Sequence, residues 1–140
     1  MMNELSEDEL TKAIVESVNR CLIVLSPNYE DRSVQCVRRI ADLIKSFVPE
    51  ARRSSIVVRL LKLQGDQQRR LLADVRDQNF ETARSILSEV KVDVRPLSIR
   101  YPEESELALR SSVRESLHIF GGERFDLFVD ISPLPRVVIL

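Results

Sequence analysis

Two short polar segments of the sequence carry residue types that could bind or act on a small molecule. The first, residues 26–33, follows the apolar run 21–25, where a strand would give way to a helix. The free amides and the dipole of a helix N-terminus attract anions. The side chains that suit phosphate are Ser26, Asn28, Arg32 and Ser33, while Glu30 and Asp31 could accept ribose hydroxyls or hold a metal. The alternative is a solvated turn in which acidic residues cap a helix.

The second polar segment lies at and just beyond the end of the predicted strand at residues 125–131. It offers Asp130, Ser132 and Arg136, and the prolines between them would stiffen the loop and fix its direction. Aspartate at the carboxyl end of a buried strand suits a ligand site, because sites in open α/β sheets lie beyond the carboxyl ends of strands. The alternative for Asp130 is a structural cap on the turn.

Several ligand classes lack their usual sequence signals. The chain has three glycines and contains neither a Gly-x-Gly-x-x-Gly nor a Walker A sequence. The absence of these motifs disfavours the usual loop binding of NAD, FAD and ATP. The sequence therefore leaves the cofactor unknown. Two cysteines and one histidine do not make a metal-ligand set, so no metal is expected. A net charge of −1 and arginine pairs without interleaved aromatics make nucleic acid an unfavourable partner.

The composition indicates a reducing compartment and no membrane. Cys21 and Cys36 lie in apolar runs, so we expect two unbridged thiols, as in cytoplasmic proteins. The acidic N-terminus is unlike a signal peptide. The longest apolar runs are about five residues, far short of a membrane span.

Hydrophobic periodicity predicts helices alternating with strands. The expected strands are residues 21–25, 55–63, 92–99 and 125–131, and the expected helices are residues 7–19, 32–48, 67–89 and 102–120. A break is expected in the third helix at residues 77–79. The predicted buried stripe of the second helix is Val37, Ile40, Ala41, Ile44, Phe47 and Val48, and that of the third is Leu72, Val75, Asn79, Ala83, Ile86, Leu87 and Val90.

Strands joined by helix-length connections pair in parallel, with right-handed crossovers. The expected fold is therefore α/β and Rossmann-like (flavodoxin-like), with a mainly parallel sheet of four to five strands and helices on both faces. Pro96 cannot donate to a sheet ladder and predicts an edge strand at residues 92–99. Residues 1–140 form one domain, and the apolar end at residues 137–140 predicts the N-terminal part of a longer protein, or else a short buried final strand.

This layout resembles that of the Rossmann-like sensor domains of prokaryotic defence systems, which bind signalling nucleotides through polar loops after the first and fourth strands. The resemblance implies a ligand-sensing or regulatory domain that binds a phosphate-bearing small molecule and relays binding to a downstream domain or partner protein; a homo-oligomer is compatible with this role. Two alternatives stay open. One is a hydrolase or phosphotransfer enzyme that uses Asp130 with Glu30 or Asp31, although the sequence favours a non-enzyme. The other is a protein-interaction module without a small ligand.

Overall fold

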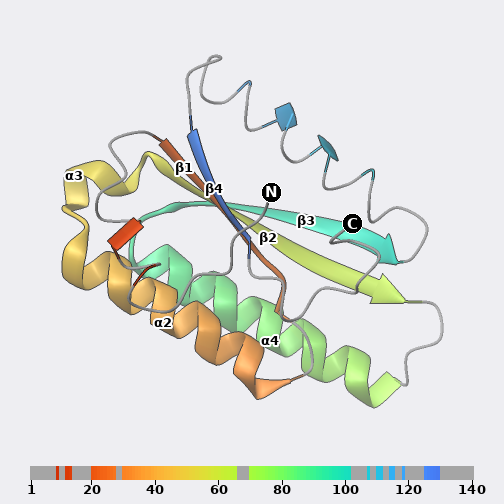
Figure 1. The fold of residues 1–140 in the computed structure, drawn as a ribbon. Helices are drawn as coiled ribbons and strands as arrows, with labels where there is room; N and C mark the ends of the chain where they lie inside the picture. The colour runs from red at the N-terminus through yellow and green to blue at the C-terminus, as the bar shows by residue number, and fades with distance from the viewer. Residues whose placement is uncertain are drawn as a thin grey trace.

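The computed structural model describes residues 9, 12–13, 20–27, 30–65, 70–101, 107, 110–111, 114–115, 118 and 125–129. Strands and helices alternate along this part of the chain (Figure 1). Of the predicted helix at 7–19, residues 9, 12 and 13 are described and helical. The elements are β1 (Arg20–Leu25), α2 (Asp31–Phe47), α3 (Glu50–Arg53), β2 (Ile56–Gly65), α4 (Arg70–Glu89), β3 (Asp93–Tyr101) and β4 (Phe125–Val129).

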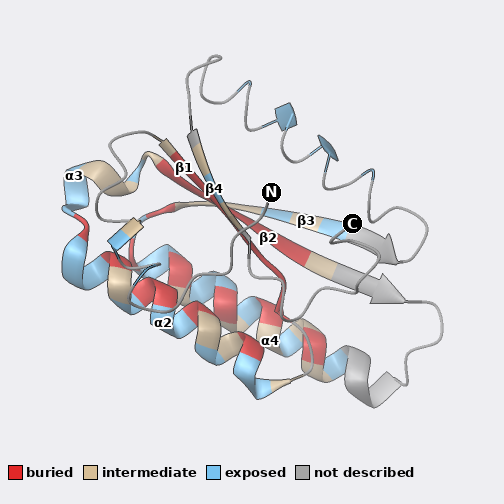
Figure 2. Cartoon of the chain, viewed as in Figure 1, coloured by how far each residue is buried: buried red, intermediate tan, exposed pale blue. Residues whose placement is uncertain are grey.

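The four strands form one parallel sheet in the order β3-β2-β1-β4. This confirms the predicted α/β, Rossmann-like fold. Strand β1 is apolar without alternation from Cys21 to Leu25, as expected where both faces of a strand are covered. Every residue from Cys21 to Leu25 is buried, and Figure 2 shows the burial concentrated along the centre of the sheet.

The strands differ in length, and this shapes the carboxyl edge of the sheet. Pairing between β1 and β2 ends at Leu25 and Leu60. Pairing between β2 and β3 continues to Gly65 and Tyr101. The backbones of β2 and β3 therefore run on past the end of β1 as a two-stranded ribbon.

Helices α2 and α4 cover one face of the sheet together (Figure 1). Right-handed crossovers that step from β1 to β2 and from β2 to β3 put both helices on the same side. The core beneath them joins alternate residues of β1 and β2 to one stripe of each helix. The stripe of α2 is as predicted, including Val48, except for Phe47, which is 55% exposed at the end of the helix.

Helix α4 corrects two expectations. It runs unbroken through residues 77–79, so the predicted break is wrong. Its buried stripe passes through Arg76 and Phe80, whereas Asn79 is half-buried. The predicted stripe is confirmed at Ala83, Leu87 and Val90, which are buried. Asn79 lies beside the buried stripe, because Phe80 rather than Asn79 faces the core in that turn.

The opposite face of the sheet is also buried, although α2 and α4 do not touch it. Its residues alternate with those of the core under the helices. They include Leu22, Val24, Val57, Arg59 and Leu61, all nearly inaccessible. Glu115 reaches Arg59, which places the helical positions described between residues 107 and 118 on this side, opposite α2 and α4 in Figure 1.

Strand β3 forms one edge of the sheet, as the proline predicted. Pro96 is the register partner of Leu60 on β2, and within the described ranges β3 has no neighbour on its other side. A proline there costs no ladder hydrogen bond to a second strand.

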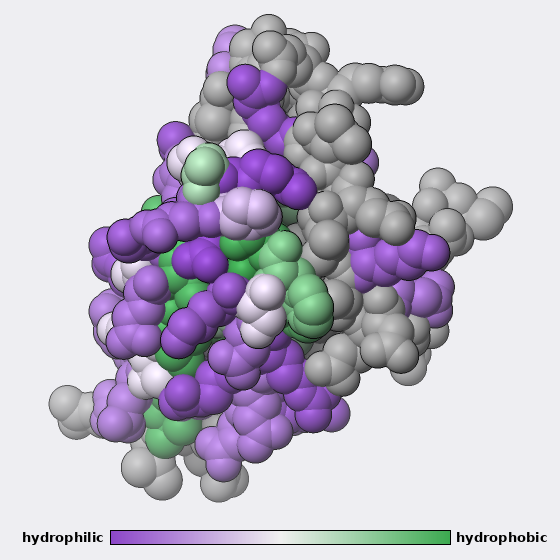
Figure 3. Space-filling view, turned by 90° about the vertical axis from the view of Figure 1, so that its left-hand side faces the viewer, coloured by the Kyte–Doolittle hydropathy of each residue, from purple (hydrophilic) through white to green (hydrophobic). Residues whose placement is uncertain are grey.

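The face of the molecule seen in Figure 3 is mainly hydrophilic, with a strip of apolar side chains between the charged ones. Among the residues that the structure describes, no helix combines the length and apolar character needed to cross a membrane.

Candidate ligand-binding site

The order of the strands reverses between β1 and β4. Chain connections step from β1 to β2 and β3 on one side, and β4 is then placed on the other side of β1. Val24 and Val129 are register partners, so the chain leaves both strands at the same edge. Ligands of open α/β sheets bind in the crevice at such a reversal. The prediction that the first and fourth strands are neighbours is confirmed.

Ser26 follows β1 at this edge and is 2% exposed. Its hydroxyl oxygen makes no hydrogen bond to any residue that the structure describes. An unpaired buried hydroxyl costs roughly 1–3 kcal/mol, and buried polar atoms in folded proteins nearly always have a partner. Ser26 therefore marks a place where a polar partner would be favourable.

Helix α2 begins at Asp31, five residues after this serine in the chain. Its N-cap residue, Glu30, makes no side-chain capping hydrogen bond. The backbone amide of Ser33 and its hydroxyl both donate to the carbonyl oxygen of Glu30, at 3.1 and 2.7 Å. The hydroxyl of Ser33 thus closes the first turn of α2. The amides at the start of any helix have no partner within it and form an anion-attracting end.

Arg32 is directed to a carboxylate of the same loop. Its Nε lies 2.5 Å from Oε2 of Glu30, and its side chain is 71% exposed. An anion at the start of α2 would have to compete with Glu30 for this guanidinium. Asp31 is exposed. Of the predicted residues in this loop, Ser26 and Ser33 are thus buried, whereas the charged residues lie nearer to solvent.

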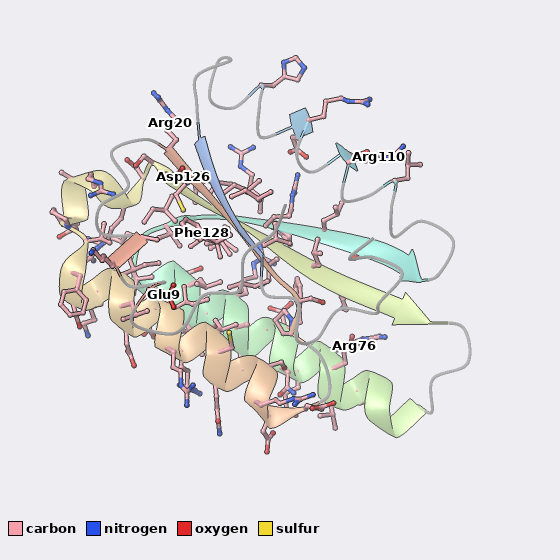
Figure 4. The ribbon with its side chains drawn as sticks, viewed as in Figure 1. Glu9, Arg20, Arg76, Arg110, Asp126 and Phe128 are labelled. Atoms are coloured by element: carbon pink, nitrogen blue, oxygen red, sulfur yellow. The ribbon has the colours of Figure 1, made fainter. Side chains whose placement is uncertain are left out.

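A second charged group, not anticipated from sequence, joins the carboxyl half of β2 to α4. Nζ of Lys62 lies 3.2 Å from Oδ1 of Asp77 and 5.5 Å from the centre of the Phe80 ring. Arg76, labelled in Figure 4, also contacts Asp77, at 3.1 Å. Arg76 is 8% exposed. The available signal was an arginine inside the predicted helix at residues 67–89, directly before the expected break at residues 77–79.

The pKa of Asp77 is lowered by this arrangement. Burial acts in the opposite direction and favours the neutral acid, but hydrogen bonds from Arg76 and Lys62 and their positive charges outweigh it. Asp77 therefore stays ionised and ties the first half of α4 to β2. This is a structural role rather than that of a proton donor or acceptor.

The other predicted site residues, Asn28, Asp130, Ser132 and Arg136, lie outside the described residues. The expected approach of Arg32 and Arg136 stays a prediction for the same reason. Within the described ranges, no three His, Cys, Asp or Glu side chains are grouped so that they could hold a metal ion. Arg20 and Asp126, labelled in Figure 4, belong to the amino-terminal ends of β1 and β4, away from Ser26.

The sequence matches no protein-family model, and a search of curated proteins finds no significant match.

Proposed function

We propose that this domain binds a phosphate-bearing small molecule, most simply a nucleotide, at the carboxyl edge of the sheet between β1 and β4. In this proposal it is a sensing or regulatory domain that transmits ligand binding to a partner domain. Ser26 carries the proposal. It unites a buried, unpaired hydroxyl with the strand reversal at which such folds bind ligands.

The electrostatics of the edge support a nucleotide over free phosphate. The start of α2 offers backbone amides and the positive end of the helix dipole to a phosphate. Asp31 is an exposed carboxylate, and Glu30 is neutralised by Arg32. A carboxylate repels phosphate but accepts hydrogen bonds from ribose hydroxyls, so a ligand with both groups satisfies the edge better than phosphate does.

The projecting ribbon of β2 and β3 adds a geometric reason. Because β1 ends at the level of Leu60 while its neighbours run on to Gly65 and Tyr101, the carboxyl end of β1 is recessed beside a longer wall of backbone. A recessed strand end beside a taller neighbour favours a concave site, which is the usual shape of small-molecule sites.

The test compares Ser26→Ala with Ser88→Ala, a helix-surface serine whose hydroxyl donates to the carbonyl of Arg84. Thermal unfolding is followed with AMP, with ATP and with adenosine. Without ligand, Ser26→Ala should be more stable than the wild type by roughly 1 kcal/mol, because an unsatisfied group is removed. With AMP or ATP the order should reverse, since bound ligand stabilises the folded state and the variant lacks one contact.

Ser88→Ala should follow the wild type with every ligand, and adenosine should have less effect than AMP. If neither AMP nor ATP stabilises the wild type, the nucleotide proposal is wrong. Conversion of ATP to ADP by the wild type would instead indicate the hydrolase alternative.

A further inference from the structure

The second face of the sheet carries two arginines side by side, one on the inner strand β2 and one on the edge strand β3. Arg59 of β2 and Arg95 of β3 are register partners. Both lie on the face opposite α2 and α4, because Val58 and Leu60, the neighbours of Arg59, belong to the core under those helices. Arg59 is 4% exposed. Strands covered on both faces are normally apolar throughout, so packing alone does not explain a guanidinium here.

This pair of arginines is electrostatically expensive unless an anion accompanies it. Neighbouring strands lie about 4.8 Å apart, and like charges directly opposite each other across strands destabilise a sheet. Burial adds the cost of removing the guanidinium of Arg59 from water. An anion that contacts both side chains would offset both costs.

A single carboxylate does contact both. Nη2 of Arg59 pairs with Oε2 of Glu115, and Nη1 of Arg95 lies 3.9 Å from Oε1 of the same side chain. Arg59 also donates from Nη1 to the carbonyl oxygen of Arg95, at 3.4 Å. Nη2 of Arg95 further contacts Oδ2 of Asp93 at 3.1 Å. The two oxygens of Glu115 therefore face two different guanidinium groups.

We propose that Arg59 and Arg95 form a binding site for a small oxyanion, either phosphate or a carboxylate, and that Glu115 occupies this site in the structure as an internal ligand. Paired guanidinium forks around one oxyanion are the arrangement by which arginine recognises carboxylates and phosphates. The side chain of Glu115 is 49% exposed while that of Arg59 is 5% exposed, so an anion from solvent can reach the carboxylate that it would replace. Displacement would free the helical positions around Glu115 from the sheet.

The site is distinct from that at Ser26, because it lies on β2 and β3 rather than at the ends of β1 and β4.

The test uses Glu115→Gln in the full chain, which keeps the size of the side chain and removes its charge. Inorganic phosphate and acetate are titrated separately, against chloride at constant ionic strength, and thermal unfolding is recorded. In chloride the variant should melt at a lower temperature than the wild type.

Phosphate or acetate should restore the melting temperature of Glu115→Gln in a saturable way, with an apparent affinity about tenfold or more above that of the wild type, because the competing carboxylate is gone. A larger effect of phosphate would identify a phosphate site, and a larger effect of acetate a carboxylate site. The double variant Arg59→Leu with Glu115→Gln, whose leucine suits a buried strand, should fold and lose the response. Glu81→Gln, on the exposed surface of α4, should behave as the wild type.

The proposal is overturned if Glu115→Gln is destabilised but responds to both anions no more than the wild type. It is also overturned if that variant fails to fold even with both anions present, or if the double variant keeps the response. Ser26→Ala combined with Glu115→Gln separates this proposal from the nucleotide site: the anion response should survive there whether or not Ser26 binds a nucleotide.

Discussion

Cys21 and Asp126 are register partners on β1 and β4, and the carboxylate helps to suppress ionisation of the thiol. Burial is the larger cause, and together they raise the pKa of Cys21 from 9.0 to about 12, against a smaller opposing effect of Arg52. Neither cysteine forms a disulfide, as the sequence predicted. Cys36, which is half-buried rather than buried, is the more accessible of the two.

The first prediction follows from this difference. Iodoacetamide at mildly alkaline pH should modify Cys36 in the native protein and reach Cys21 only after denaturation, because the thiolate is the reactive form and Cys21 is buried as a thiol. Mass spectrometry of peptides locates the adduct. The Cys36→Ser variant serves as the control and should stay unmodified while folded. Rapid modification of native Cys21 would contradict the structure.

The same thiol predicts a pH effect on stability. Below pH 9.0 the thiol of Cys21 is protonated in both folded and unfolded protein, so its contribution is constant. Between pH 9.0 and about 12 the unfolded thiol ionises while the folded one does not, which stabilises the unfolded state. The wild type should therefore lose stability relative to Cys21→Ala as the pH rises through this range. Denaturant unfolding at a series of pH values measures the difference, and parallel curves would refute it.

A third prediction compares two residues of α2. Ile44→Ala should lower the free energy of unfolding by roughly 2–5 kcal/mol, because Ile44 is fully buried in the core under the helices. Phe47→Ala, at an exposed position of the same helix, should change it by no more than about 0.5 kcal/mol. Urea unfolding measures both. A large loss at Phe47 would show that it is covered in the folded protein.

The fourth prediction concerns Asp77. Because Arg76 and Lys62 hold its pKa below 3.8, its ion pairs stabilise the fold above that pH and are lost as the pH falls through the folded pKa. In Lys62→Met the pKa of Asp77 should rise toward its ordinary value, so the variant should lose less stability than the wild type as the pH falls through the acid range. Carbon-detected NMR titration of the carboxyl gives the pKa. An unchanged value would mean that Lys62 does not contact Asp77 in solution.

The fifth prediction uses Lys91, whose φ of 61° lies in the left-handed region just after α4. That conformation costs a residue with a side chain about 1–2 kcal/mol and costs glycine almost nothing. Lys91 also pairs with Glu50 at 2.5 Å, but both side chains are exposed, and solvent and salt screen such a pair so that it contributes little to stability. Lys91→Gly should therefore be more stable than the wild type by about 1 kcal/mol.

Glu50→Gln is the control for Lys91→Gly, since it removes the ion pair and leaves the backbone unchanged. It should cost little. If Lys91→Gly is the less stable of the two variants, the ion pair outweighs the backbone conformation and the prediction is wrong.

The fold was more predictable from sequence than the site, for physical reasons. The uninterrupted apolar run from Cys21 to Leu25 is enough to indicate a strand covered on both faces, and Pro96 is enough to indicate an edge. Helix boundaries agreed to within a few residues where proline or a polar turn ends the pattern. The short helix α3 was missed because one turn of helix has no periodicity to detect.

The buried charges escaped prediction because hydrophobic patterns assign charged residues to the surface. Arg59 falls within the predicted strand at residues 55–63 and Arg76 within the predicted helix at residues 67–89, but neither was predicted to be buried. Each of these arginines pairs with a carboxylate that a hydrophobic pattern does not connect to it. Arg59 pairs with Glu115, which is distant in sequence. Arg76 pairs with Asp77, which also binds Lys62. Ser26 could be named as a candidate from its place after an apolar run, but its unpaired hydroxyl could be seen only with the surrounding side chains in place.

The strand order has a consequence for biosynthesis. A ribosome makes β1 first of the four strands and β4 last, yet the two are neighbours in the finished sheet. Until β4 emerges, one edge of the most apolar strand is open in the nascent chain, and open apolar edges invite pairing with other chains. The sheet can close only after β4 has been made, so β1 stays open to pairing with other chains until then.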